Sequence, residues 1–211
     1  METLLKSFNG MPFTHNTLLS LLTGYKSPNE KIHRWMAQGV LLQIKRGFYV
    51  VSPDYSGEVI SLPLIANQLY GPSYVSLDYA LYHYGLIPEK VVDVTSVTTK
   101  RSKIFSSGLG RFSYVHLPAP YYSQGIFQVN ESERVVFLMA SPEKALCDRL
   151  VLTRNLRIYS KKALLGYLLV DLRVDKSELQ TFNIPLLKAC ASSGVKVELL
   201  SLLVKLVESL K

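Results

Sequence analysis

Side chains suited to contacting duplex DNA gather in one short stretch, residues 27–51, which reads SPNEKIHRWMAQGVLLQIKRGFYVV. Arginine pairs well with guanine and glutamine with adenine, so Arg34 and Gln38 are candidates for reading base edges. Other cationic groups in the stretch can neutralise backbone phosphates, which adds affinity without sequence information. The stretch therefore predicts a DNA-binding surface.

The candidate residues form two sets. The set for a recognition helix is Asn29, Lys31, His33, Arg34 and Gln38. The set for phosphate contacts and a hairpin tip is Lys26, Ser27, Lys45, Arg46 and Gly47. Glu30 would repel phosphate, but its carboxylate can accept from cytosine or simply favour the N-terminus of the helix.

Three helices and a hairpin must position these side chains. The expected helices are residues 2–8, a second that Thr14 or Asn16 caps, and a third that Ser27 or Asn29 caps. Ile32, Trp35 and Met36 share one face of the third helix, which leaves Arg34 opposite. Two β-prone runs, residues 40–44 and 48–51, then predict a hairpin with Gly47 in its tight link. This order of elements is typical of a winged helix-turn-helix, whose second helix braces the third in the major groove.

The charge of the chain agrees with an anionic partner. Its 211 residues carry a net charge of +8 and an isoelectric point of about 9.4. Residues 1–52 hold six basic and two acidic residues, so half of the net charge lies in a quarter of the chain. These side chains could also be the solvated faces of an ordinary small domain. We expect DNA binding, because the order of elements agrees with the charge.

The remainder of the chain predicts a second, mixed unit. Residues 53–57 read as a linker, and helices are expected at 59–70 and from Ser76. Strands are expected within 91–99, 111–117, 125–129 and 134–139, followed by a Ser141-capped helix and a mostly helical end from Tyr159. We therefore predict an α+β protein with a winged helix at about 1–55 and a mixed α/β domain with a helical C-terminal part at about 56–211.

The sequence shows no pattern of an enzyme. Its four histidines are scattered, and no metal-ligand spacing, nucleophile elbow or phosphate loop is present. A nuclease needs convergent carboxylates, and the acidic residues considered for this role fall in no nuclease signature: Asp78, Glu89, Asp93, Glu143 and Asp148. We expect no catalytic residue, no metal and no cofactor. The alternatives are a protein-interaction module that docks through its winged helix and, less favoured, a nucleic-acid-processing enzyme.

Two features bear on location and on further contacts. Cys147 and Cys190 lie far apart in apolar contexts, which predicts buried free thiols and a cytoplasmic protein. No signal peptide or membrane-spanning run is recognisable, so no membrane partner is expected.

A second basic cluster could extend a DNA footprint, meet RNA or form a solvated face: Arg154, Arg157, Lys161 and Lys162.

Five segments between residues 1 and 150 occur in the order of one known family: LLQIKRGFYVV, YVSLDYALYHYGLIPE, VTSVTT, FSYVHL and SPEKALCDRL. In this respect the chain resembles AbiEi-type antitoxins of bacterial type IV toxin–antitoxin systems. The resemblance implies an N-terminal winged helix that binds promoter repeats, which are double-stranded DNA, and represses its own operon. It also implies a C-terminal domain that opposes a nucleotidyltransferase-like toxin, with no direct contact required.

The same resemblance places the DNA-reading role on Lys31, Arg34 and Gln38. It places the wing role on Lys45, Arg46 and Gly47. Palindromic operators would favour a homodimer, although no segment of the sequence marks a dimer interface.

Overall fold

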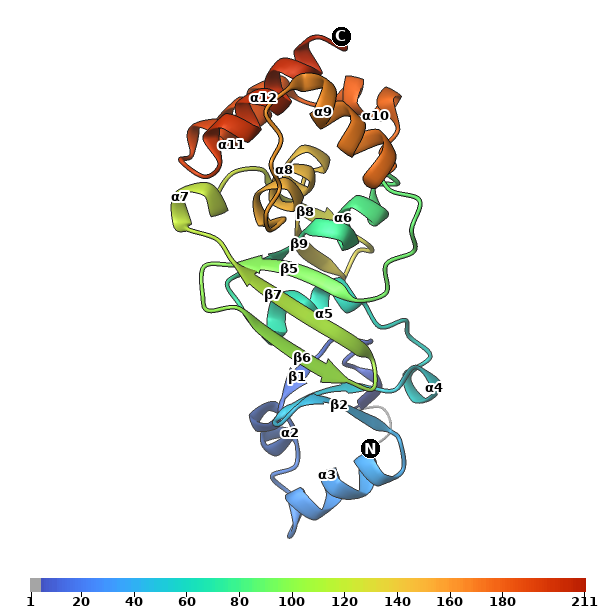
Figure 1. Ribbon diagram of the computed structural model, residues 1–211. Coiled ribbons are helices and arrows are strands. Elements are labelled where there is room, and N and C mark those ends of the chain that lie inside the picture. Colours follow the sequence, from blue (N-terminus) through green and yellow to red (C-terminus); the bar gives the residue numbers. More distant parts are fainter. Residues whose placement is uncertain (1–4) are drawn as a thin grey trace.

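The computed structural model describes residues 5–211 and is a mixed α+β fold with two sheets (Figure 1). A small N-terminal unit lies at one end of the molecule, a six-stranded sheet lies in the middle, and the helices within residues 161–208 form the other end (Figure 1). Among the described residues, no helix combines the length and the apolar character needed to cross a membrane.

The N-terminal unit contains β1 (Phe13–Thr14), α2 (His15–Leu21), α3 (Pro28–Ala37), β2 (Leu41–Lys45) and β3 (Phe48–Val51). Its strands are antiparallel in the order β1-β3-β2. The Thr14 hydroxyl accepts from the Thr17 backbone N–H and caps α2, as predicted. Pro28 occupies the first turn of α3. The helix expected at residues 2–8 falls partly outside the described residues.

The β2–β3 hairpin is packed on both faces. Tyr49 and Val51 join the core of the N-terminal unit, which also contains Trp35. Phe48 and Val50 point the other way and join the core of the larger unit. All four residues of β3 are therefore buried, and the hairpin is a layer shared by two hydrophobic cores.

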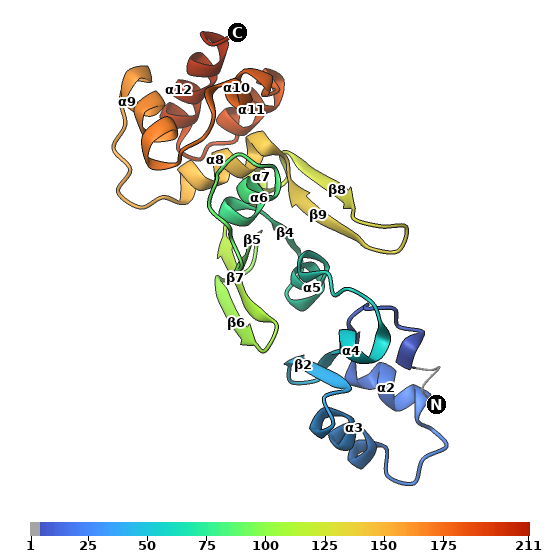
Figure 2. The ribbon, with the colours of Figure 1, turned by 90° about the vertical axis from the view of Figure 1, so that its right-hand side faces the viewer.

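The larger unit begins with α4 (Pro53–Ser56), α5 (Leu62–Leu69), β4 (Ser73–Val75) and α6 (Leu77–His83). It continues with β5 (Val94–Thr98), β6 (Lys103–Ser107), β7 (Gly110–His116), α7 (Ala119–Tyr122), β8 (Ile126–Asn130), β9 (Val136–Ala140) and α8 (Pro142–Leu152). The strand order is β6-β7-β5-β4-β9-β8, with parallel pairs β5–β7 and β4–β9. The β6–β7 and β8–β9 hairpins splay apart on either side of α5 (Figure 2).

The C-terminal helices cover α8. They are α9 (Lys161–Gly166), the π-helical turn η1 (Tyr167–Asp171), α10 (Lys176–Thr181), α11 (Ile184–Ser192) and α12 (Val197–Glu208). Helices α11 and α12 pack against each other and against α8. Both cysteines are buried free thiols, as predicted.

Three expectations about elements need correction. Residues 53–56 form the short helix α4 rather than an irregular linker. Helix α5 begins at Leu62, since Pro63 fits the first turn and the Ser61 hydroxyl caps it. Strands β1, β4 and β6 were not expected, because they are short and show no alternating pattern.

Candidate nucleic-acid interface

Helix α3 has one buried face and one exposed polar face. Ile32 and Trp35 are buried in the N-terminal core. His33, Arg34 and Gln38 are exposed, and Gln38 ends the helix. The helix therefore presents the three polar side chains to solvent while its apolar face stays fixed, which is what a helix needs to enter a major groove.

His15, at the start of α2, contacts both helix α3 and strand β3. The Nε2 atom of His15 lies 3.1 Å from Oδ1 of Asn29, in the first turn of α3. Its Nδ1 atom lies 3.3 Å from the Tyr49 hydroxyl on β3. Asn29 therefore already has an intramolecular partner, and His15 links α2, α3 and β3.

The cations in and just before α3 have no carboxylate partner among the described residues. The Lys31 ammonium lies 5.1 Å from the centroid of the Trp35 ring and is half-buried. Lys26 and Ser27 are exposed just before the helix, and the Ser27 side chain makes no capping bond. Within residues 5–211, no carboxylate forms an ion pair with Lys26, Lys31 or Arg34.

The hairpin tip departs from the expected free wing. The Lys45 ammonium donates to the Leu69 carbonyl at 2.6 Å and thus reaches the larger unit. Burial lowers the pKa of Lys45, and the charges of Lys103 and Lys100 lower it further. Lys45 is therefore tied to the larger unit instead of protruding from a free wing.

The rest of the turn is held against α2. The Gly47 carbonyl accepts from the His15 backbone N–H at 2.8 Å. Gly47 has a φ of +76°, a conformation that residues with a side chain rarely adopt. Arg46 is exposed. Of the two hairpin cations, Arg46 is exposed and Lys45 is half-buried.

No family model matches the sequence, and no curated protein matches it. The likeness to AbiEi-type antitoxins therefore depends on the five sequence segments alone.

The second basic cluster lies far from α3. Arg154 and Arg157 are exposed in the segment between α8 and α9, and Lys161 and Lys162 are exposed at the start of α9. Helix α9 and helix α3 lie at opposite ends of the molecule (Figure 1). The cluster therefore does not join the surface around α3.

The carboxylates considered for a nuclease do not converge. Each meets a different partner: Asp78 with Arg149, Glu89 with Arg173, Asp93 with Arg111, Glu143 with the Asn183 N–H, and Asp148 with Lys144. Across residues 5–211, no three His, Cys, Asp or Glu side chains are placed to hold a metal ion.

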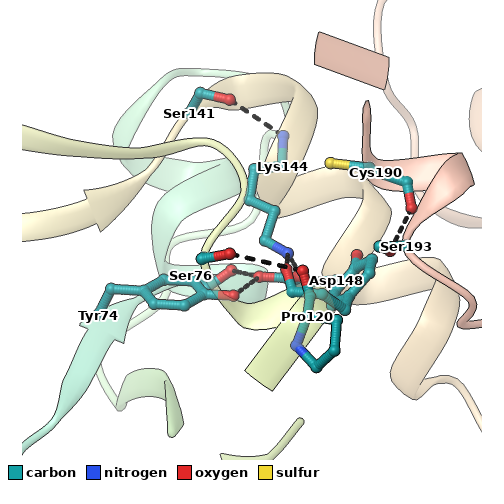
Figure 3. A network of polar contacts seen from close by, with 10 residues as sticks. Tyr74, Ser76, Pro120, Ser141, Lys144, Asp148, Cys190 and Ser193 are labelled. Atoms are coloured by element: carbon teal, nitrogen blue, oxygen red, sulfur yellow. Dashed lines mark hydrogen bonds and ion pairs between the residues drawn. The ribbon is translucent and has the colours of Figure 1, made fainter. Parts of the chain in front are cut away.

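The most concentrated polar network is closed to solvent (Figure 3). Lys144 Nζ lies 3.1 Å from Asp148 Oδ1, and both side chains have no exposed surface. The Tyr74 and Ser76 hydroxyls donate to Asp148 Oδ2 at 2.9 and 2.6 Å. Burial raises the pKa of Asp148, while the Lys144 ammonium and the Ser76 hydroxyl oppose the rise. Lys144 also donates to the Tyr121 carbonyl, so the network joins α8 to β4 and α7.

Proposed function

We propose that this chain is a sequence-specific DNA-binding protein in which α3 is the recognition helix of a winged helix-turn-helix. The observation that carries the proposal is the exposed polar face of α3, which holds Arg34 and Gln38 opposite a buried Trp35. The succession of α2, α3 and a β-hairpin, and the bracing of α3 by His15, support it.

Within this proposal, Arg34 and Gln38 read base edges, and His33 lies beside them. Lys26, Lys31 and Arg46 contact phosphates, which adds affinity to every duplex alike. Lys45 has a different role, because its ammonium is held at the junction with the larger unit.

The biological role follows from the resemblance to AbiEi-type antitoxins. We propose a cytoplasmic repressor of its own toxin–antitoxin operon, which acts as antitoxin against a nucleotidyltransferase-like toxin. The net charge of +8 supports a nucleic-acid partner. A toxin-like reading frame beside this gene would support the operon assignment, and its absence would count against it.

Fluorescence anisotropy with a duplex from upstream of the gene, and with a scrambled duplex, tests the DNA-binding proposal. Affinity should fall steeply between low and moderate salt, because phosphate contacts release counterions. Arg34→Ala should weaken binding to the upstream duplex by ~1–3 kcal/mol. The control Lys176→Ala removes one positive charge from the exposed start of α10 and should bind like the wild type.

Two outcomes would contradict the proposal. If Arg34→Ala and Lys176→Ala bound the upstream duplex with equal affinity, α3 would not be part of the DNA interface. Absence of salt-dependent binding to any duplex would instead favour a protein-docking module.

A further inference from the structure

Three lysines from distant parts of the chain meet beside the β2–β3 hairpin. Lys45, at the end of β2, donates to the Leu69 carbonyl at 2.6 Å. Lys100 lies between β5 and β6, and its ammonium donates to the Gly71 carbonyl. Lys103 is the first residue of β6. The two carbonyls are two residues apart at the end of α5, so they gather Lys45 and Lys100 in one place. We call these three lysines the junction lysine cluster.

Two aromatic rings form the floor of the junction lysine cluster. The Lys103 ammonium lies 4.8 Å from the Phe105 centroid and 5.8 Å from that of Tyr70. Lys100 lies 5.4 Å from the Tyr70 centroid, and Lys45 lies 5.5 Å from that of Phe105. The two ring centroids are 5.9 Å apart. Cation–π attraction therefore holds all three ammonium groups over one small platform.

Over residues 5–211, no carboxylate balances the charges of the junction lysine cluster. In the described part of the chain, none of the ion pairs includes Lys45, Lys100 or Lys103. Lys100 and Lys103 are exposed, so an external group can reach them. Carbonyls and rings hold the ammonium groups but do not cancel their repulsion, which an anion would relieve.

The position of the junction lysine cluster indicates which anion fits. It spans the hairpin that follows α3 and the edge strand β6, which lies next to β2 (Figure 1). Arg46 follows Lys45 in the sequence, Arg101 follows Lys100, and both arginines are exposed. The Tyr70 hydroxyl donates to the Arg101 carbonyl at 3.1 Å. Several exposed cations near the boundary of the N-terminal unit suit the repeated phosphates of a nucleic-acid strand better than a single small anion.

We propose that Lys100 and Lys103, the exposed members of the junction lysine cluster, bind backbone phosphates of the duplex that α3 reads. The larger unit thereby adds affinity for DNA that is independent of base sequence. This inference rests on the proposed function, and it adds a second surface that the winged helix alone does not provide.

The test compares Lys100→Ala/Lys103→Ala with Lys176→Ala/Lys205→Ala, a control that removes two exposed lysines from α10 and α12. Lys45 is left in place because it joins the two units. Anisotropy is measured over a salt series with the upstream duplex and the scrambled duplex. Thermal unfolding of each variant establishes that it is folded.

The junction variant should bind both duplexes roughly 10- to 50-fold more weakly at 0.1 M salt, and its salt slope should fall by about 2. Its preference for the upstream duplex should not change. The junction variant could instead bind with the affinity and salt slope of the wild type while Arg34→Ala still loses its preference for the upstream duplex. That result would overturn the proposal for the junction lysine cluster and leave the proposal for α3 standing. Failure of the wild type to bind any duplex would overturn the proposed function itself.

Discussion

Helix α3 and the β2–β3 hairpin follow each other in the chain and carry basic residues of the same kinds. On α3, Arg34 is exposed and the apolar residues face a single core. On the hairpin, Lys45 is tied to the Leu69 carbonyl, and alternate residues of β3 face two cores. An element with one free face therefore keeps its basic side chains exposed, whereas on the hairpin, which is packed on both sides, the strand residue Lys45 is tied down and the turn residue Arg46 stays exposed.

The largest loss of stability is expected from the buried Lys144–Asp148 pair of α8, which is packed on every side and contrasts most strongly with the exposed face of α3. Lys144→Met should lower the free energy of unfolding by ~3–5 kcal/mol, because it leaves the Asp148 carboxylate buried without its cation. Urea unfolding measures the effect. Lys188→Met, which breaks the exposed pair with Glu208, is the matched control and should cost about 0–1 kcal/mol. Equal effects of the two substitutions would show that the α8 network is not closed to water.

The second-largest loss of stability is expected from a substitution in the β2–β3 hairpin. Phe48→Ala should lower the free energy of unfolding by about 3 kcal/mol, because it opens a cavity where the hairpin meets the larger core. Arg34→Ala, on the exposed face of α3, should change it by less than about 0.5 kcal/mol. Thermal or urea unfolding compares the two. A Phe48→Ala protein as stable as the wild type would mean that the hairpin is a free wing after all.

A smaller loss of stability is expected from removing His15, which links α3 to the hairpin strand β3. His15→Ala removes the contacts to Asn29 and Tyr49 and should cost about 1 kcal/mol of stability. DNA affinity should also fall, since α3 loses its brace. Asn16→Ala, an exposed neighbour, is the control. Loss of stability with unchanged DNA affinity would show that His15 does not position the recognition helix.

The smallest expected effect is a pH dependence at Lys45. Its pKa in the folded protein lies below 10.5, so between these two values the unfolded chain binds more protons than the folded chain. Raising the pH through this window should therefore stabilise the wild type relative to Lys45→Met. Urea unfolding at a series of pH values measures the difference. A constant difference across the window would mean that the Lys45 ammonium is not desolvated at the junction.

Most of the longer elements could be predicted because each has a local cause. Ser141 followed by Pro142 starts α8, and Gly47 allows the tight turn between β2 and β3. The strands that were missed lack such a cause. Strand β4 has three residues, and β6 is a mostly exposed edge strand with no buried face to mark it. Pairing with distant strands forms them, and a single sequence does not show that pairing.

The candidate site could be predicted only in part for the same reason. Helical periodicity places Arg34 opposite Ile32 and Trp35, and this needs no tertiary information. The environment of Lys45 depends on the end of α5 and on Lys100 and Lys103, which lie far away in the sequence. One local signal was present, because the unbroken apolar run FYVV is typical of a strand buried on both faces.

The central claim is that the exposed face of α3 reads bases. Selection of binding sites from a pool of randomised duplexes, with the wild type, Arg34→Ala and Gln38→Ala, tests it most directly. The wild type should select one motif, and each variant should lose preference at one base pair of that motif while keeping the rest. Recovery of the same complete motif by all three proteins would contradict the claim.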